Sequence, residues 1–266
     1  MRERTSISRA LSEVILRAKS SVILVGVLVT AVLAGGVYFY ACASIITGGI
    51  IYEWMRASGL KYRPLAAIGS ASLMFMSLLQ LPWSNACAAV AFLAYFWCNR
   101  DALSTVLRAS VVVVGAAYIL VAMRLLGMLY CTHGKMFVLW MFMCIWLTDT
   151  GAFFAGRYFK GAKIAPKISP NKAWSGFFGG VGTSVLVGSF VASFVVSPNV
   201  LHKVPLLALA IATFGTAGDL LESACKRYFG VKDMGSLIPG HGGMADRFDS
   251  TLLVAIVCSL IFWLQS

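Results

Sequence analysis

Apolar residues occupy this chain in long runs, and polar residues are confined to short segments between those runs. A run of about 20 helical residues is long enough to cross the hydrocarbon core of a bilayer. The pattern therefore predicts an all-α, polytopic integral membrane protein with about nine transmembrane helices. We expect residues 1–266 to form a single membrane domain.

The predicted spans are separated by polar residues, by the Gly35-Gly36 turn or by proline-containing segments such as Ser197-Pro198-Asn199. They are 21–34, 36–54, 65–81, 84–98, 106–123, 135–150, 174–196, 204–222 and 250–265. Residues 1–20 form a basic lead-in, and residues 21–134 hold the N-terminal helices. Residues 135–266 hold the C-terminal helices, together with two long polar loops, 151–173 and 223–249.

The distribution of positive charge predicts the orientation of the spans. With the N-terminus in the cytoplasm, nine spans place only Arg124, Lys135 and Lys203 outside, so nineteen of the 22 Lys and Arg residues lie inside. Basic residues gather in cytoplasmic segments of membrane proteins. We therefore expect the N-terminus and both polar loops on the cytoplasmic side.

Composition supports a membrane protein and argues against nucleic-acid binding. Hydrophobic residues make up 59% of the chain and charged residues 12%, about half the usual charged share of globular domains. The net charge of +12 is explained by the basic cytoplasmic segments, so no nucleic-acid partner is expected. The seven cysteines are scattered without a Cys-x-x-Cys pair, which indicates neither a zinc site nor a disulfide framework.

Charged residues are concentrated between Asp219 and Asp249, in a segment that separates two apolar runs. On a helix, Asp219, Glu222, Ser223 and Lys226 share one face, because they are spaced at i, i+3, i+4 and i+7. Asp246 and Asp249 form a second pair at the start of the last span. Paired carboxylates suit magnesium, although a salt-bridge network with Lys226, Arg227 and Arg247 remains an alternative.

Two further segments have features of phosphate-binding sites. The glycine-rich loop 236–243 leads into a helix, and glycines together with a helix N-terminus favour contact with anions. Within this loop we expect His241 to contact phosphate rather than to transfer protons. In the other segment Asp149 ends a span, and Ser169-Pro170-Asn171-Lys172 is predicted to form a turn that holds phosphate before the next span.

The string from Ser223 to Asp249, SACKRYFGVKDMGSLIPGHGGMADRFD, closely resembles the signature of CTP:phosphatidate cytidylyltransferases, also called CDP-diacylglycerol synthases. The segments Asp149–Arg157 and Lys167–Lys172 resemble a second block of that family, so the resemblance covers roughly residues 140–255. One departure follows this block. The family pattern continues with Thr and, two positions later, Glu, whereas this chain has Ala173 and Ser175.

The resemblance implies the reaction of CTP with phosphatidate to give CDP-diacylglycerol and pyrophosphate, dependent on Mg²⁺. It also implies an integral multi-pass protein of the bacterial inner membrane with a cytoplasmic active site. A second metal ion and a homodimer remain open.

Combined with the spacing of the residues, the resemblance assigns roles. Catalytic roles are expected for Asp219, Asp246, Asp249, Lys226 and His241. Metal binding is expected for Asp219, Glu222, Asp246 and Asp249. Substrate binding is expected for Asp149, Lys167, Ser169, Lys172, Ser223, Arg227, Lys232, Gly242, Gly243 and Arg247.

Three alternatives share part of this pattern. A CTP-dependent lipid kinase of the polyprenol type would also use a membrane, CTP, magnesium and carboxylates, but would release CDP and a phosphorylated alcohol. A membrane transporter would place its charged residues along a path through the midplane. An inactive relative that acts as a binding partner is suggested only by Ala173 and Ser175.

Overall fold

The computed structural model describes residues 19–61, 63–78, 106–196, 198–238, 240 and 242–264. Most of these residues are helical. A first helix, Lys19–Ala34, precedes α2 (Gly36–Ala57), α3 (Arg63–Leu78), α5 (Val106–Phe159), α6 (Trp174–Val195), α7 (Pro198–Leu201), α8 (Val204–Tyr228) and α9 (Ala245–Trp263). Two short antiparallel strands, β1 (Lys163–Ala165) and β2 (Ser169–Ala173), form a hairpin before α6.

The structure is that of an α-helical membrane protein. Three of the described helices are long and apolar enough to cross a membrane, namely Leu107–Phe159, Trp174–Val195 and Val204–Tyr228, and Lys19–Ala34 is a shorter apolar helix. The prediction of span 174–196 is confirmed to within one residue. The predicted span 84–98 lies outside the described residues.

Several predicted boundaries are wrong because helices continue past their apolar runs. Residues 124–133 are helical, and α5 breaks only at Gly134, whose φ of 82° and ψ of 172° are not helical. Residues 151–159, predicted as loop, extend α5 to Phe159, and the chain then turns at Lys160 and Gly161, which both have positive φ. The predicted turn at Ser169–Lys172 is strand β2.

The second polar loop and the segment after span seven also differ from their predicted structure. The predicted loop 223–249 is shorter, because α8 runs to Tyr228 and α9 begins at Ala245. Pro198, predicted within a closing turn, begins the short helix α7, since proline fits the first turn of a helix. A helix can continue into polar sequence, because its backbone hydrogen bonds do not depend on the hydropathy of the side chains.

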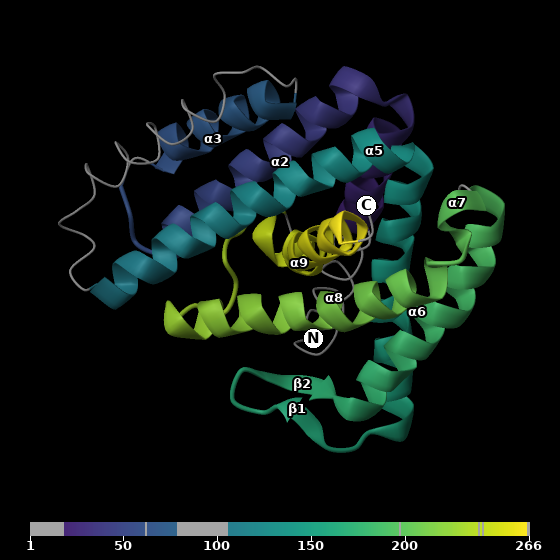
Figure 1. Ribbon diagram of the computed structural model, residues 1–266. Helices are drawn as coiled ribbons and strands as arrows, with labels where there is room; N and C mark the ends of the chain where they lie inside the picture. The colour runs from purple at the N-terminus through teal and green to yellow at the C-terminus, as the bar shows by residue number, and fades with distance from the viewer. Residues whose placement is uncertain are drawn as a thin grey trace, which may run out of the picture.

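Helix α9 lies at the centre of the fold, with α2 and α5 on one side and α8 on the other (Figure 1). After the break at Gly134, the second part of α5 changes direction and packs along α6 (Figure 1). The hairpin lies beyond α8 at the end of these two helices. Large side chains fill the core, including the almost fully buried Phe39, Phe137 and Trp140.

Small residues bring α5 and α6 into close contact. The buried residues of α6 are Gly176, Gly180, Ser184, Gly188 and Ala192, one every four positions. A Cβ at Gly180 would lie 2.6 Å from the Thr148 carbonyl oxygen, and one at Gly188 would lie 2.8 Å from the Cys144 sulfur. Small residues at such spacing are typical of helix packing in membranes, where close backbone approach provides the attraction.

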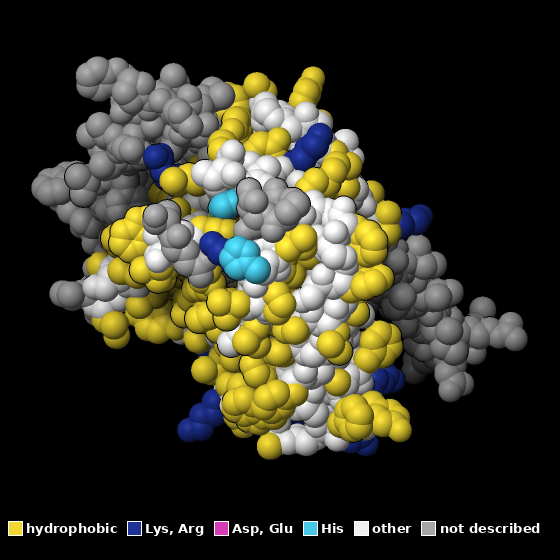
Figure 2. Space-filling model, turned by 45° about the vertical axis from the view of Figure 1, so that its right-hand side comes forward, with side chains coloured by type: hydrophobic (Ala, Val, Ile, Leu, Met, Phe, Trp, Pro, Cys, Tyr) yellow, Lys and Arg dark blue, Asp and Glu magenta, His cyan; other side chains and the backbone are white. Residues whose placement is uncertain are grey.

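The opposite face of α6 is apolar and exposed. Phe178, Leu186, Phe190 and Phe194 are 66–74% exposed in the isolated chain. Figure 2 shows a face of the molecule covered mainly by apolar side chains, with most of the visible Lys and Arg toward its margins and no acidic side chain in view. Such a surface is suited to contact with lipid tails.

Candidate active site

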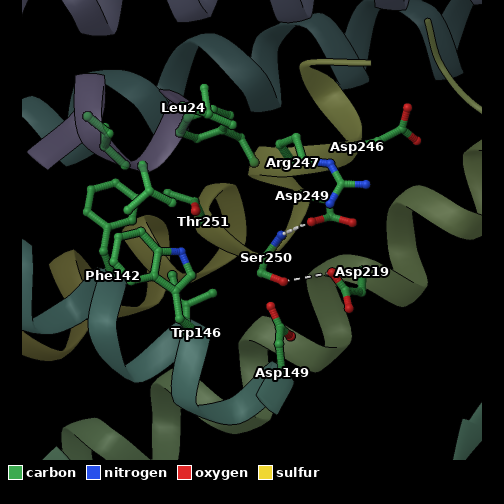
Figure 3. A pocket seen from close by; sticks show the side chains of 14 residues that line it. Leu24, Phe142, Trp146, Asp149, Asp219, Asp246, Arg247, Asp249, Ser250 and Thr251 are labelled. Carbon is green, nitrogen blue, oxygen red and sulfur yellow. Dashed lines mark hydrogen bonds between the residues drawn. The ribbon is translucent and has the colours of Figure 1, made fainter. Parts of the chain in front are cut away.

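Residues distant in sequence line one pocket of about 250 Å³. Its acidic residues come from three helices: Asp149 from α5, Asp219 from α8, and Asp246 and Asp249 from the first turns of α9. Figure 3 shows Leu24, Phe142 and Trp146 on the other side of the same pocket. The structure thus brings four of the predicted acids together beside an apolar wall, whereas Glu222 lines a neighbouring, mostly apolar cavity with Asp249.

Helices α8 and α9 approach closely at Asp219 and Asp249. A Cβ at Gly218 would lie 2.7 Å from the Asp249 carbonyl oxygen, so only glycine fits there without displacement. The Ser250 hydroxyl donates to Asp219 Oδ1 at 2.7 Å, and the Ser250 amide donates to Asp249 Oδ1 at 2.7 Å (Figure 3). Lys172 of β2 forms an ion pair with Asp219 Oδ2.

Lys226 pairs with both carboxylates that flank it. Its ammonium lies 2.8 Å from Asp246 Oδ1 and 3.5 Å from Glu222 Oε2. The other oxygen of Asp246 accepts hydrogen bonds from the amides of Gly243 (2.8 Å) and Met234 (3.2 Å). Part of the salt-bridge network considered as an alternative is therefore present. Asp246 binds both the Lys226 ammonium and two backbone amides of the loop.

Glu222 differs from the other acids, because neither of its buried carboxylate oxygens has a hydrogen-bond partner. Leaving a buried carboxylate without hydrogen bonds is costly, and the Lys226 ammonium at 3.5 Å offsets part of that cost. In the described part of the chain, no three His, Cys, Asp or Glu side chains are already arranged as a metal site. The all-oxygen donor set and the unsatisfied Glu222 nevertheless fit the preference of magnesium for carboxylates.

The loop between α8 and α9 is folded back on itself. The Ile238 amide donates to the Gly242 carbonyl at 3.0 Å, and Gly240 and Gly242 adopt φ of 77° and 81°, which glycine tolerates best. A Cβ at Gly242 would lie 3.2 Å from Asp246 Oδ2. His241 lies outside the described residues, so its phosphate-contacting role stays a prediction.

The remaining predicted residues are spread around this centre. Arg247 is exposed and lines the pocket, Ser223 is half-buried on α8, and Ser169 begins β2 opposite Ala165. The exposed Arg227 donates to the Ile168 carbonyl at 3.4 Å, which connects α8 to the hairpin. Lys167 and Lys232 are exposed on the hairpin turn and on the α8–α9 loop.

The two departures from the family pattern have local roles. Ala173 is buried at the start of α6, and the Ser175 hydroxyl donates to the Lys160 carbonyl. Ser175 thereby ties the start of α6 to the turn that leads into the hairpin.

Sequence reasoning assigned no role to Ser250 or Glu53, although it counted Glu53 among the acids at the cytoplasmic ends of predicted spans. Ser250 connects Asp219 and Asp249, but a serine at the start of a helix is too common to single out. Glu53 is fully buried and accepts hydrogen bonds from the loop. The cost of a carboxylate in a predicted span marks Glu53 as unusual but does not identify its partners.

Comparison with known proteins agrees with the family resemblance seen in the sequence. Residues 15–265 match the sequence model of a family described as the Cytidylyltransferase family. A phosphatidate cytidylyltransferase of Staphylococcus epidermidis is 43% identical over 130 residues, 49% of this chain and 50% of that protein. The corresponding protein of Brucella suis is 46% identical over 123 residues, 46% of this chain and 45% of that protein. That of Staphylococcus saprophyticus is 40% identical over 152 residues, 55% of this chain and 58% of that protein. The chain spans about half the length of the curated relatives it matches.

Proposed function

Because the chain belongs to the cytidylyltransferase family, we propose that it is an enzyme that transfers the cytidylyl group of CTP to phosphatidate. A phosphate oxygen of phosphatidate attacks the α-phosphorus of CTP, and the bond from that phosphorus to the bridging oxygen of the β-phosphate breaks. The products are CDP-diacylglycerol and pyrophosphate. Three relatives that share 40–46% identity with parts of the chain carry the name of this activity.

The observation that carries the proposal is the composition of the pocket. One side is formed by Asp149, Asp219 and Asp249, and the other by apolar side chains that include Phe142 and Trp146 (Figure 3). A lipid phosphate has the same two-sided character, since its charged head joins directly to apolar chains. A pocket with both surfaces can hold the head near the carboxylates while the chains remain in an apolar environment.

The carboxylates would hold Mg²⁺. Glu222 is a candidate ligand because its oxygens lack hydrogen-bond partners, although the Lys226 ammonium lies 3.5 Å from one of them. Asp219 and Asp249, which line the pocket, are further candidates. Asp246 has fewer free positions, since it already accepts from two amides and pairs with Lys226. When bound, magnesium would neutralise charge on the phosphates and on the leaving pyrophosphate.

The cationic side chains of the site supply the rest of the electrostatic stabilisation. Lys172 and Lys226 each contact acids of the site, and Arg247 lines the pocket. Reactants that are both polyanions repel one another, and fixed positive groups offset that repulsion most effectively where water is excluded. Phosphatidate is already ionised at neutral pH, so positioning rather than proton removal is the main requirement.

We also propose nine spans, a cytoplasmic N-terminus and a cytoplasmic active site in the bacterial inner membrane. The packing supports this topology. Segments expected outside lie together, because the Gly36 amide donates to Tyr130 Oη at 3.2 Å and His133 stacks on Phe262. Segments expected inside also lie together, since Arg56 donates to Ser236 Oγ at 3.3 Å.

The test is a product assay with the purified full chain in lipid nanodiscs, using labelled CTP, phosphatidate and Mg²⁺. We expect CDP-lipid and pyrophosphate in equal amounts, and neither when phosphatidate is omitted. CDP together with a phosphorylated alcohol, when a polyprenol is supplied instead, would identify a lipid kinase. Absence of both reactions would refute the proposed activity.

A further inference from the structure

Glu53, near the end of α2, is an acid that the site described above does not use. Its side chain is 0% exposed, and it does not line the pocket of Figure 3. In the described part of the chain it has no cationic partner within ion-pair distance. A fully buried carboxylate without a cation needs hydrogen bonds that compensate for lost hydration.

Those hydrogen bonds come from the loop between α8 and α9. The Leu237 amide donates to Glu53 Oε1 at 3.2 Å, and the Ala245 amide donates to Glu53 Oε2 at 2.9 Å. Ala245 is the first residue of α9, so the carboxylate also lies at the positive end of that helix. One side chain of α2 thus fixes two points of the loop that are eight residues apart in sequence.

Glycines make room for Glu53 on the loop side. A Cβ at Gly235 would lie 2.1 Å from Glu53 Oε1, and a Cβ at Gly243 would lie 2.3 Å from Glu53 Oε2. Gly243 also contacts the other carboxylate that holds the loop, because its amide donates to Asp246 Oδ2. The loop is therefore held between Glu53 on one side and Asp246 on the other.

The contact between α2 and the loop involves one face of the helix. Gly49, Glu53 and Arg56 share that face, because they are spaced at i, i+4 and i+7. A Cβ at Gly49 would lie 2.7 Å from the Met244 sulfur, and Arg56 donates to Ser236 Oγ. The end of α2 is shaped to receive the loop, with the Glu53 carboxylate at the centre of the contact.

We propose that Glu53 is a positioning residue for nucleotidyl transfer: by fixing the loop from Met234 to Ala245, it holds Asp246, and through Asp246 the Lys226 ammonium, at the active site. This inference rests on the proposed function. It assigns part of the catalytic geometry to the N-terminal half of the chain, which the family signature does not include.

The experiment compares Glu53→Ala and Glu53→Gln with wild type, all as full-length protein in lipid nanodiscs. Misplacement of catalytic groups by about 1 Å can cost about 100-fold in rate, so Glu53→Ala should lower kcat about 100-fold with a smaller change in the KM for CTP. Glu53→Gln keeps one acceptor oxygen and should lose only about tenfold. Gly235→Ala should resemble Glu53→Ala, because the added methyl displaces the carboxylate.

The matched control is Thr47→Val. Thr47 is also fully buried on α2, but its hydroxyl donates only to the Ala43 carbonyl and does not reach the loop. We expect this variant to keep near wild-type kcat. A loss in Thr47→Val equal to that in Glu53→Ala would show general damage to α2 and would overturn the inference.

A second readout is amide hydrogen exchange in peptides covering residues 233–247, which does not depend on activity. Exchange should become about tenfold faster in Glu53→Ala, less so in Glu53→Gln, and remain unchanged in Thr47→Val. Wild-type kcat or unchanged exchange in Glu53→Ala would refute the positioning role. If wild type makes no CDP-lipid, the proposed function fails. Faster amide exchange in Glu53→Ala would in that case still support the role of Glu53 in fixing the loop.

Discussion

At the scale of single residues, Asp246 joins two tasks that are separate in many active sites. One of its oxygens binds the Lys226 ammonium, and the other accepts two amides of the loop. Its negative charge is therefore needed for the electrostatics of the site, while its acceptor oxygens are needed for the loop. An amide side chain in its place would separate these two tasks.

Asp246→Asn should leave the protein folded in the membrane and lower kcat by about 100- to 1000-fold, the range found when one preorganised electrostatic contact is lost. The Asn oxygen can still accept from Gly243, so the melting temperature should change little. Initial rates and thermal unfolding in nanodiscs would measure both effects. Activity close to wild type would rule out an electrostatic role for this carboxylate.

Glu222 gives a separate prediction about magnesium. Because its oxygens have no hydrogen-bond partners, Glu222→Gln should fold normally but need about tenfold more Mg²⁺ for half-maximal activity, as is common when metal coordination is weakened. Thr216→Val on the same helix, whose hydroxyl contacts only the Ala212 carbonyl, provides the control. An unchanged Mg²⁺ requirement in Glu222→Gln would exclude Glu222 as a ligand.

Local spacing predicts part of the site and misses the rest for a physical reason. The pairs Asp219–Glu222 and Asp246–Asp249 follow from helical periodicity, which depends only on nearby residues. Glu53 forms its hydrogen bonds with residues 184 and 192 positions away. No local pattern encodes such contacts, because they depend on the packing of α2 against a loop that has no regular structure.

At the scale of elements, the contact between α5 and α6 sets the position of Asp149, because the preceding residue, Thr148, packs against α6. Gly180 approaches the Thr148 carbonyl, whereas nothing lies within 4 Å of a Cβ at Gly182. The two glycines are on the same helix and differ only in what they face. They therefore form a natural pair of test positions.

Gly180→Leu should force α5 and α6 apart and cost about 1–3 kcal/mol of stability, as overpacking usually does. The displacement of Asp149 should also reduce kcat. Gly182→Leu should keep both stability and activity near wild type. Thermal unfolding and rates of the two variants in the same lipid provide the measurement, and equal effects would contradict the assigned packing.

The predicted ends of the helices were accurate only where a helix ends together with its apolar run. Helix α6 was predicted to within one residue because its ends coincide with the ends of an apolar run. The C-terminal ends of α5 and α8 and the start of α9 were not, since polar residues extend each helix there beyond its apolar part. Strands of three and five residues are too short to produce a recognisable alternation.

At the scale of the whole molecule, the fold separates two ends with different chemistry. One end holds the carboxylates, the loop and the hairpin. The other holds the Gly35-Gly36 turn, Tyr130, His133 and Phe262, which contact one another or lie close by. The proposed topology assigns the first end to the cytoplasm and the second to the outside.

Single cysteines in a cysteine-free background test this topology. We expect Lys203→Cys to react with a membrane-impermeant maleimide in intact cells. Lys167→Cys, on the turn of the hairpin, should react only after the membrane is permeabilised. The reverse labelling pattern would invert the proposed orientation, and labelling of both sites in intact cells would contradict the nine-span arrangement.

The pairing of Glu53 with the loop also has a consequence for biosynthesis. During translation Glu53 leaves the ribosome 184 residues before Leu237, and at about 5–20 residues per second that interval is roughly 10–40 s. Throughout it, α2 carries a carboxylate whose amide partners do not yet exist. The segment from Leu237 to the start of α9 therefore supplies the backbone amides that allow Glu53 to become buried.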